Sequence, residues 1–82
     1  MVNENILLED IKKLVFEINA EISYNDYMNF AEQGIDSLDY AFIVVNLEKN
    51  HGIDVLNLEI AWNKITTPHE LATVFLKVYK NE

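Results

Sequence analysis

Apolar residues recur at helical spacing in the first part of the chain. From about Asn5 to Asn19 they fall three or four positions apart, at Leu7, Ile11, Leu14 and Ile18, and Val15 widens the stripe. Such spacing gathers the apolar side chains on one face of an α-helix. The pattern predicts a first amphipathic helix over these residues.

The stretch from Asn19 to Asp36 keeps apolar residues but has no sustained period. Those residues are Ile22, Tyr24, Tyr27, Met28 and Phe30. A loop this long in a small domain is usually packed down or functional. We expect it to lie across the core, with a short helical turn after Ser23 or Asn25.

Helical patterns return after this loop. A second helix is predicted from about Ser37 to Asn50, with Gly52 as its terminator. A third, short helix is expected from Asn57 to about Asn63.

The start of the last helix is the clearest signal in the chain. Thr67 is a capping residue, Pro68 suits the first turn, and Glu70 completes a capping box. The buried stripe predicted for this helix is Leu71, Val74, Phe75 and Val78. The whole pattern therefore predicts an all-α fold, a small four-helix bundle with a long first loop and a short third helix.

The second predicted helix carries two apolar stripes. One is Tyr40, Ile43, Val44, Leu47 and His51, and the other is Leu38, Ala41, Phe42 and Val45. The helix is either largely surrounded by the other helices or presents its second stripe to partners. We favour the second interpretation, with the Leu38 stripe exposed.

Composition narrows the function classes. The 82 residues form one domain, 1–82, and 50% of them are hydrophobic. Fourteen acidic residues against six lysines and no arginine give a net charge of −8, which speaks against nucleic acid and for basic partners. The chain has no cysteine, which fits a reducing compartment.

Neither a leader segment nor a membrane span is expected. The first ten residues include Glu4, Glu9 and Asp10, and no apolar run approaches the roughly 20 residues that a span requires. We therefore expect a cytoplasmic protein. Its two histidines are isolated and no cysteine nucleophile is present, so the sequence predicts neither an enzyme nor a metal site.

The segment 34–39, Gly-Ile-Asp-Ser-Leu-Asp, places a serine hydroxyl at the junction between a loop and a helix. Gly34 suits a positive φ, and either Asp36 or Ser37 is able to cap the helix. A phosphodiester on Ser37 would lie beside unpaired N–H groups at the positive end of the helix dipole. Alone, this short motif is also typical of ordinary helix starts.

In context, the segment resembles the attachment motif of the acyl carrier protein family. Leu47-Glu48, Gly52-Ile53 and the run 64–67, Lys-Ile-Thr-Thr, resemble further parts of the same family in the same order. The resemblance implies a 4′-phosphopantetheine arm on Ser37, transferred from coenzyme A by a phosphopantetheinyl transferase that binds Mg²⁺ at its own site. The thiol of the arm then carries acyl groups as thioesters, and the carrier itself catalyses nothing.

The resemblance also implies a partner-binding surface beside the arm. Its predicted residues are Asp36, Leu38, Asp39, Ala41, Phe42, Val45 and Glu48. The expected partners are the transferase and acyl-loading and acyl-using enzymes with basic and apolar docking patches, bound by a monomeric carrier.

Two departures from carriers of fatty acid synthesis favour a specialised lipid or polyketide-type pathway. Phe42 and Lys49 stand where glutamates are common, and the run 55–62 is more apolar and lacks a proline. Trp62, within that run, is expected to be buried or half-buried. Two alternatives remain open: an aminoacyl or peptidyl carrier, and an unmodified helical adaptor that binds through its second helix.

Overall fold

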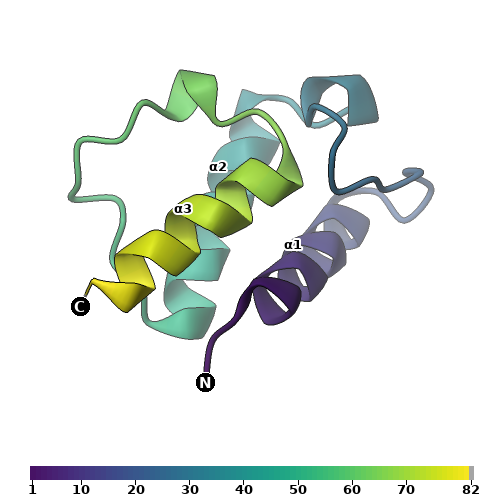
Figure 1. Cartoon of the computed structure of the whole chain (residues 1–82). Coiled ribbons are helices and arrows are strands. Elements are labelled where there is room, and N and C mark those ends of the chain that lie inside the picture. The colour runs from purple at the N-terminus through teal and green to yellow at the C-terminus, as the bar shows by residue number, and fades with distance from the viewer. Residues whose placement is uncertain (82) are drawn as a thin grey trace.

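Three α-helices form the frame of the computed structural model, which describes residues 1–81 (Figure 1). They are α1 (Glu4–Ile18), α2 (Ser37–His51) and α3 (Pro68–Lys80), with 3₁₀ turns at Ala31–Gln33 and Trp62–Lys64 and no strand in the described range. The all-α prediction is confirmed, but the arrangement is not a four-helix bundle. None of the described helices has the length and apolar character to cross a membrane.

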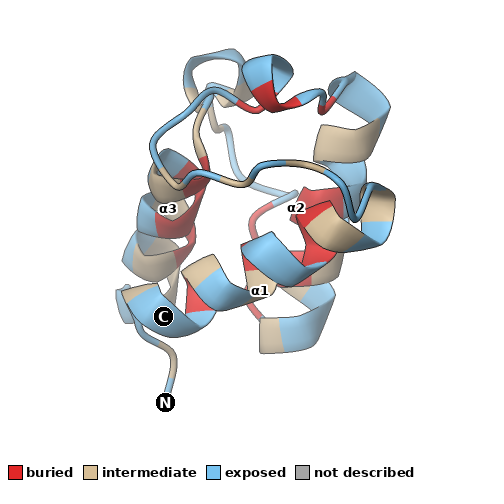
Figure 2. Cartoon of the chain, turned by 90° about the vertical axis from the view of Figure 1, so that its right-hand side faces the viewer, coloured by how far each residue is buried: buried red, intermediate tan, exposed pale blue. Residues whose placement is uncertain are grey.

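One hydrophobic core lies between the three helices (Figure 2). Its buried members are Leu7, Ile11, Leu14 and Val15 from α1, Ile43, Val44 and Leu47 from α2, Leu71, Ala72 and Phe75 from α3, and Phe30, Ile35, Ile53 and Val55 from the loops. Fully burying a side chain of this size stabilises a fold by about 1.5–3 kcal/mol. The four loop residues tie both connecting segments to the helices.

The helix ends follow the local chemistry of the sequence. The Asn3 side chain caps α1 by accepting a hydrogen bond from the amide of Ile6 at 2.9 Å. At α3 the Thr67 hydroxyl accepts from the amide of Glu70 and the Glu70 carboxylate accepts from the amide of Thr67, both at 3.1 Å. This confirms the predicted capping box. Gly52 ends α2 with a φ of 64°, as expected of a glycine terminator.

The predicted short helix at 57–63 is wrong. A turn at residues 56–58 and the 3₁₀ turn Trp62–Lys64 replace it. The Glu48 carboxylate accepts hydrogen bonds from the amides of Val55 and Leu56, at 2.9 and 3.0 Å, which holds the start of this loop. Val55 is buried whereas Leu56 and Leu58 are exposed, so the apolar residues of this segment do not share one helical face.

The long first loop is organised by a buried polar side chain, Gln33. Its Oε1 accepts from the amide of Asn25 at 3.1 Å, and its Nε2 donates to the carbonyls of Asn25 and Met28 at 2.9 and 2.8 Å. A turn follows Asn25, where a short helical turn was expected, but it is not helical: the amides of Tyr27 and Met28 donate to the Asn25 side chain and carbonyl. Gln33 therefore supplies the partners that an irregular, partly buried backbone needs.

The loop covers the core only in part. Phe30 is buried, and its amide donates to the carbonyl of Thr66 at 2.8 Å, which joins the loop to the segment before α3. Ile22 and Tyr24 are half-buried. Tyr27 and Met28 are exposed, so the expectation that they lie against the core is wrong. This loop and the segment before α3 together frame the N-terminal end of α2.

Candidate functional site

Ser37 is the first residue of α2 and its side chain is exposed. Gly34, with a φ of 86°, ends the 3₁₀ turn before it, and a left-handed φ of this kind favours glycine. Ile35 is buried, and its amide donates to the carbonyl of Phe30 at 2.9 Å. The chain is thus anchored two residues before the serine, and the hydroxyl is presented to solvent at a fixed helix end.

Asp36, and not Ser37, caps α2. The Asp36 carboxylate accepts from the amide of Asp39 at 2.8 Å, and the Asp39 carboxylate lies 3.4 Å from the amide of Asp36. Within residues 1–81 the Ser37 hydroxyl and the amides of Ser37 and Leu38 have no hydrogen-bond partner. The serine oxygen is therefore free to react, beside two unpaired donors at the positive end of a helix.

An apolar hollow of about 360 Å³ opens next to Ser37. Apart from Ser37 and Asp36, its wall includes Phe30 and Ile35 from the first loop, Tyr40 from α2, and Trp62 and Ile65 from the segment before α3. Because these residues come from three separate segments, sequence reasoning did not find the hollow. Its apolar lining suits a hydrocarbon group attached near the serine.

Tyr40 fixes one wall of this hollow. Its hydroxyl donates to the carbonyl of Ile65 at 2.9 Å, and its ring contacts the rings of Phe30 and Trp62 edge-on. Burial, with a smaller contribution from the nearby Glu70 carboxylate, raises the pKa of Tyr40 to about 12. The phenol therefore stays protonated and remains a hydrogen-bond donor at neutral pH.

The second stripe of α2 is exposed. Leu38 is 80% exposed, Phe42 41% and Val45 46%, and Ala41 lies beside them on the surface. On the other stripe Ile43, Val44 and Leu47 are buried, while Tyr40 and His51 are half-buried. The interpretation that one stripe faces the core and the other faces solvent is confirmed.

Three of the predicted partner-binding residues are acidic, and the structure gives them different surroundings. Asp36 is exposed at the start of α2, and Asp39 is half-buried within the capping box. Glu48, near the other end of α2, holds the loop that follows the helix. The amides of Leu56 and Val55 donate to its carboxylate and keep the pKa of Glu48 below its usual range.

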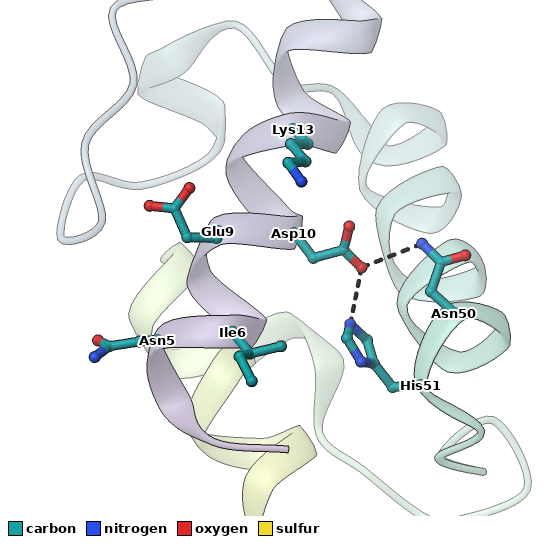
Figure 3. Close-up of a pocket in the computed structure, with 7 residues that line it drawn as sticks. All are labelled: Asn5, Ile6, Glu9, Asp10, Lys13, Asn50 and His51. Carbon is teal, nitrogen blue, oxygen red and sulfur yellow. Dashed lines mark hydrogen bonds and ion pairs between the residues drawn. The ribbon is translucent and has the colours of Figure 1, made fainter. Parts of the chain in front are cut away.

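A second hollow, of about 620 Å³, lies between α1 and α2 at the other end of the second helix (Figure 3). There the Asp10 carboxylate pairs with His51 at 2.9 Å and accepts from the Asn50 side chain at 3.1 Å. His51 is the last residue of a helix of 15 residues that begins at Ser37, so at 1.5 Å per residue the two lie roughly 20 Å apart. This hollow is separate from the serine site.

Both histidines pair with carboxylates of α1, since His69 lies 3.2 Å from Glu4. The sequence showed the two histidines only as isolated residues and did not reveal these pairs. Among the described residues no three His, Cys, Asp or Glu side chains gather as metal ligands.

Comparisons of the chain with protein-family models, with curated proteins and with solved structures gave no match. The candidate site therefore rests on the residues and geometry of this chain.

Proposed function

We propose that this chain is an acyl carrier protein that bears a 4′-phosphopantetheine arm on Ser37. The observation that carries the proposal is an exposed serine that takes no part in capping its helix and opens onto an apolar hollow. The two unpaired amides at the helix start favour the negative charge of a phosphodiester. The sequence resemblance described above supports the same reading.

The attachment is a phosphoryl-group transfer from coenzyme A. The Ser37 oxygen forms a bond to the phosphorus that bears the pantetheine arm. The bond that breaks joins this phosphorus to the oxygen that bridges the two phosphorus atoms of the diphosphate in coenzyme A. Adenosine 3′,5′-bisphosphate leaves, and the serine proton passes to a base on the transferase. Ser37 contributes the nucleophilic oxygen, and the helix start stabilises the phosphodiester that remains.

The exposed stripe of Leu38, Ala41, Phe42 and Val45 would dock the partner enzymes. It begins next to Ser37, so an enzyme that covers it would also reach the arm. The net charge of −8 of the whole chain favours partners with basic residues around an apolar patch. We further propose that the carrier works as a cytoplasmic monomer in a specialised lipid or polyketide-type pathway.

The test is the intact mass of the protein after incubation with coenzyme A and a phosphopantetheinyl transferase of broad specificity. A gain of one phosphopantetheine group supports the carrier function. No gain, with the protein folded, would favour an unmodified adaptor that uses the exposed stripe alone. Adenylating enzymes that load amino acids onto the modified protein would identify an aminoacyl or peptidyl carrier.

A further inference from the structure

The exposed stripe of α2 continues beyond its last apolar residue to a lysine. Lys49 follows Val45 by four residues and Phe42 by seven, so it lies on the same face of the helix. At 1.5 Å per residue it is roughly 16 Å along the helix from Leu38. The Lys49 side chain is exposed and forms no ion pair within the described part of the chain. A free ammonium group therefore stands at the end of the stripe that is remote from Ser37.

The end of the stripe next to Ser37 has the opposite charge. Asp36 is exposed directly before the serine, and Asp39 lies in the first turn of α2. Their carboxylates bond to backbone amides, and neither pairs with a cationic side chain in the described residues. The face therefore runs from two acidic side chains, over apolar ones, to a lysine.

Two further acidic residues near the remote end do not cancel this order. Glu48 is half-buried and lies to one side of the stripe, where its carboxylate accepts from two amides of the following loop at 2.9 and 3.0 Å. The Asp54 carboxylate, in that loop, accepts from the side chain of Asn57 at 3.1 Å. A partner's cation would have to compete with these donors. On the stripe itself, the charge presented at this end is that of Lys49.

We propose that Lys49 is a specificity-determining residue of the docking surface and that it pairs with an acidic side chain of the partner enzyme. The proposal rests on the proposed function, since the partners are the enzymes that act on the arm of Ser37. A matching partner carries basic residues next to Asp36, an apolar patch over the middle of the stripe, and a carboxylate at the remote end. A partner that is basic throughout places a like charge opposite Lys49 and is disfavoured.

The same order of charges sets the direction of docking. A partner turned end for end on the stripe brings its carboxylate to Asp36 and its basic residues to Lys49, so both contacts become repulsive. Direction matters because the proposed arm leaves α2 at one end only, at Ser37. Lys49 therefore helps to keep the entrance of the partner's active site at the end of the helix that bears the cargo.

The test uses the full chain with Ser37→Cys, which supplies the only thiol of the protein, and two model peptides of equal length. Each peptide is an amphipathic helix with leucines along one face and with a cysteine beside two lysines at its start. One peptide ends in two glutamates and the other in two lysines. The equilibrium constant of the disulfide between chain and peptide is measured for both in a thiol redox buffer at low salt. Since both peptides are tethered beside Asp36 by the same end, the ratio of the two constants reports on the remote end of the stripe.

We expect Lys49→Glu to lower the ratio of the glutamate-ended to the lysine-ended peptide by roughly threefold to tenfold. Lys49→Gln should lower it less, and it carries the test if the glutamate variant does not fold. Lys12→Glu is the matched control, because it changes the net charge equally at an exposed position of α1, in the hollow between that helix and the first loop. It should leave the ratio almost unchanged. At about 1 M salt, where the screening length is about 3 Å, the effect of Lys49→Glu should fade.

An equal change in Lys49→Glu and Lys12→Glu would overturn the proposal, because net charge alone would then set the preference. An unchanged or raised ratio in Lys49→Glu would overturn it as well. Loading from coenzyme A is measured separately on the chain that keeps Ser37. If loading fails while the ratio depends on Lys49, the carrier function fails and the charge preference of the surface stands. If loading succeeds and the ratio does not depend on Lys49, only the role of Lys49 fails.

Discussion

The carboxylate of Asp36 accepts a hydrogen bond from the amide of Asp39 at 2.8 Å, across the residue that begins α2. The Asp39 carboxylate returns toward the amide of Asp36 at 3.4 Å. These two side chains cap the helix, so Ser37, which lies between them in the sequence, is not needed as a capping residue. A reactive hydroxyl is therefore available at a helix end that does not depend on it.

The first prediction is that Ser37→Ala leaves stability almost unchanged. We expect its free energy of unfolding to stay within about 0.5 kcal/mol of the unaltered chain, as for ordinary surface substitutions. Asp36→Ala removes the cap and should cost about 0.5–2 kcal/mol. Urea unfolding of both variants checks the ranking. An equal loss in the two would mean that Ser37 shares the capping role.

The second prediction concerns the charge of Asp36 during arm transfer. Asp36→Asn keeps a good capping side chain but removes the charge, and Asp36→Lys reverses it. We expect the transfer rate at low salt to fall in the order unaltered chain, Asp36→Asn, Asp36→Lys. Its dependence on salt should weaken in the same order, because exposed charges are screened beyond about 8 Å at physiological ionic strength.

Glu9→Gln is the control for this series. It removes one negative charge at the hollow between α1 and α2, at the far end of the second helix. Its transfer kinetics should match those of the unaltered chain. Equal slowing in Glu9→Gln and Asp36→Asn would show that net charge alone matters and that Asp36 is outside the transferase interface.

The third prediction separates the two stripes of α2. Leu47 is fully buried, so Leu47→Ala should cost about 2–5 kcal/mol, whereas Leu38→Ala, at an exposed position, should cost less than about 0.5 kcal/mol. Phe42→Ala should cost about 1 kcal/mol, since its ring is partly covered. Thermal unfolding measures the costs, and a partner enzyme's use of the loaded Leu38→Ala and Phe42→Ala carriers measures docking. Unimpaired use of both would remove the case for an apolar docking surface.

The fourth prediction is a loss of stability in acid that depends on two carboxylates. The amides of Leu56 and Val55 lower the pKa of Glu48, and the amide of Thr66, with further bonds from Thr66 and Thr67, lowers that of Glu70. Each of these carboxylates has a folded-state pKa below its unfolded value of about 4.5, so its ionised form stabilises the folded protein above that pH. This stabilisation is lost as the pH falls through the lowered folded-state pKa.

Glu48→Gln and Glu70→Gln test this dependence by urea unfolding at a series of pH values. Each variant should be less stable than the unaltered chain at neutral pH, and the difference should shrink as the pH falls from about 5 to about 3. A difference that stays constant over this range would mean that the carboxylate charge does not contribute.

Local sequence signals account for the three helices and for the exposed serine. The stripe of α1, the capping box around Thr67 and Glu70, and the glycine terminator at Gly52 each act within one or two turns of the chain. The two stripes of α2 also follow from helical geometry alone, because residues three and four apart share a face.

Contacts between distant residues account for what the sequence did not reveal. The run 55–62 is apolar enough for a helix. However, the amides at the start of this run donate to the Glu48 carboxylate, and the leucines of the run are exposed. A glutamine in a loop is expected at the surface, yet Gln33 is only 8% exposed. Its side chain forms hydrogen bonds with backbone groups five and eight residues away. The hollow beside Ser37 needs three segments to meet, so no single stretch of sequence carries its signal.

The most direct test of the central claim compares arm transfer at the two serines of the chain. Ser23 is exposed in the first loop and provides the matched control for Ser37. After incubation with coenzyme A and a phosphopantetheinyl transferase, intact mass should show one added arm on the unaltered chain and on Ser23→Ala, and none on a folded Ser37→Ala. An arm on Ser37→Ala, or no arm on the unaltered chain, would contradict the account.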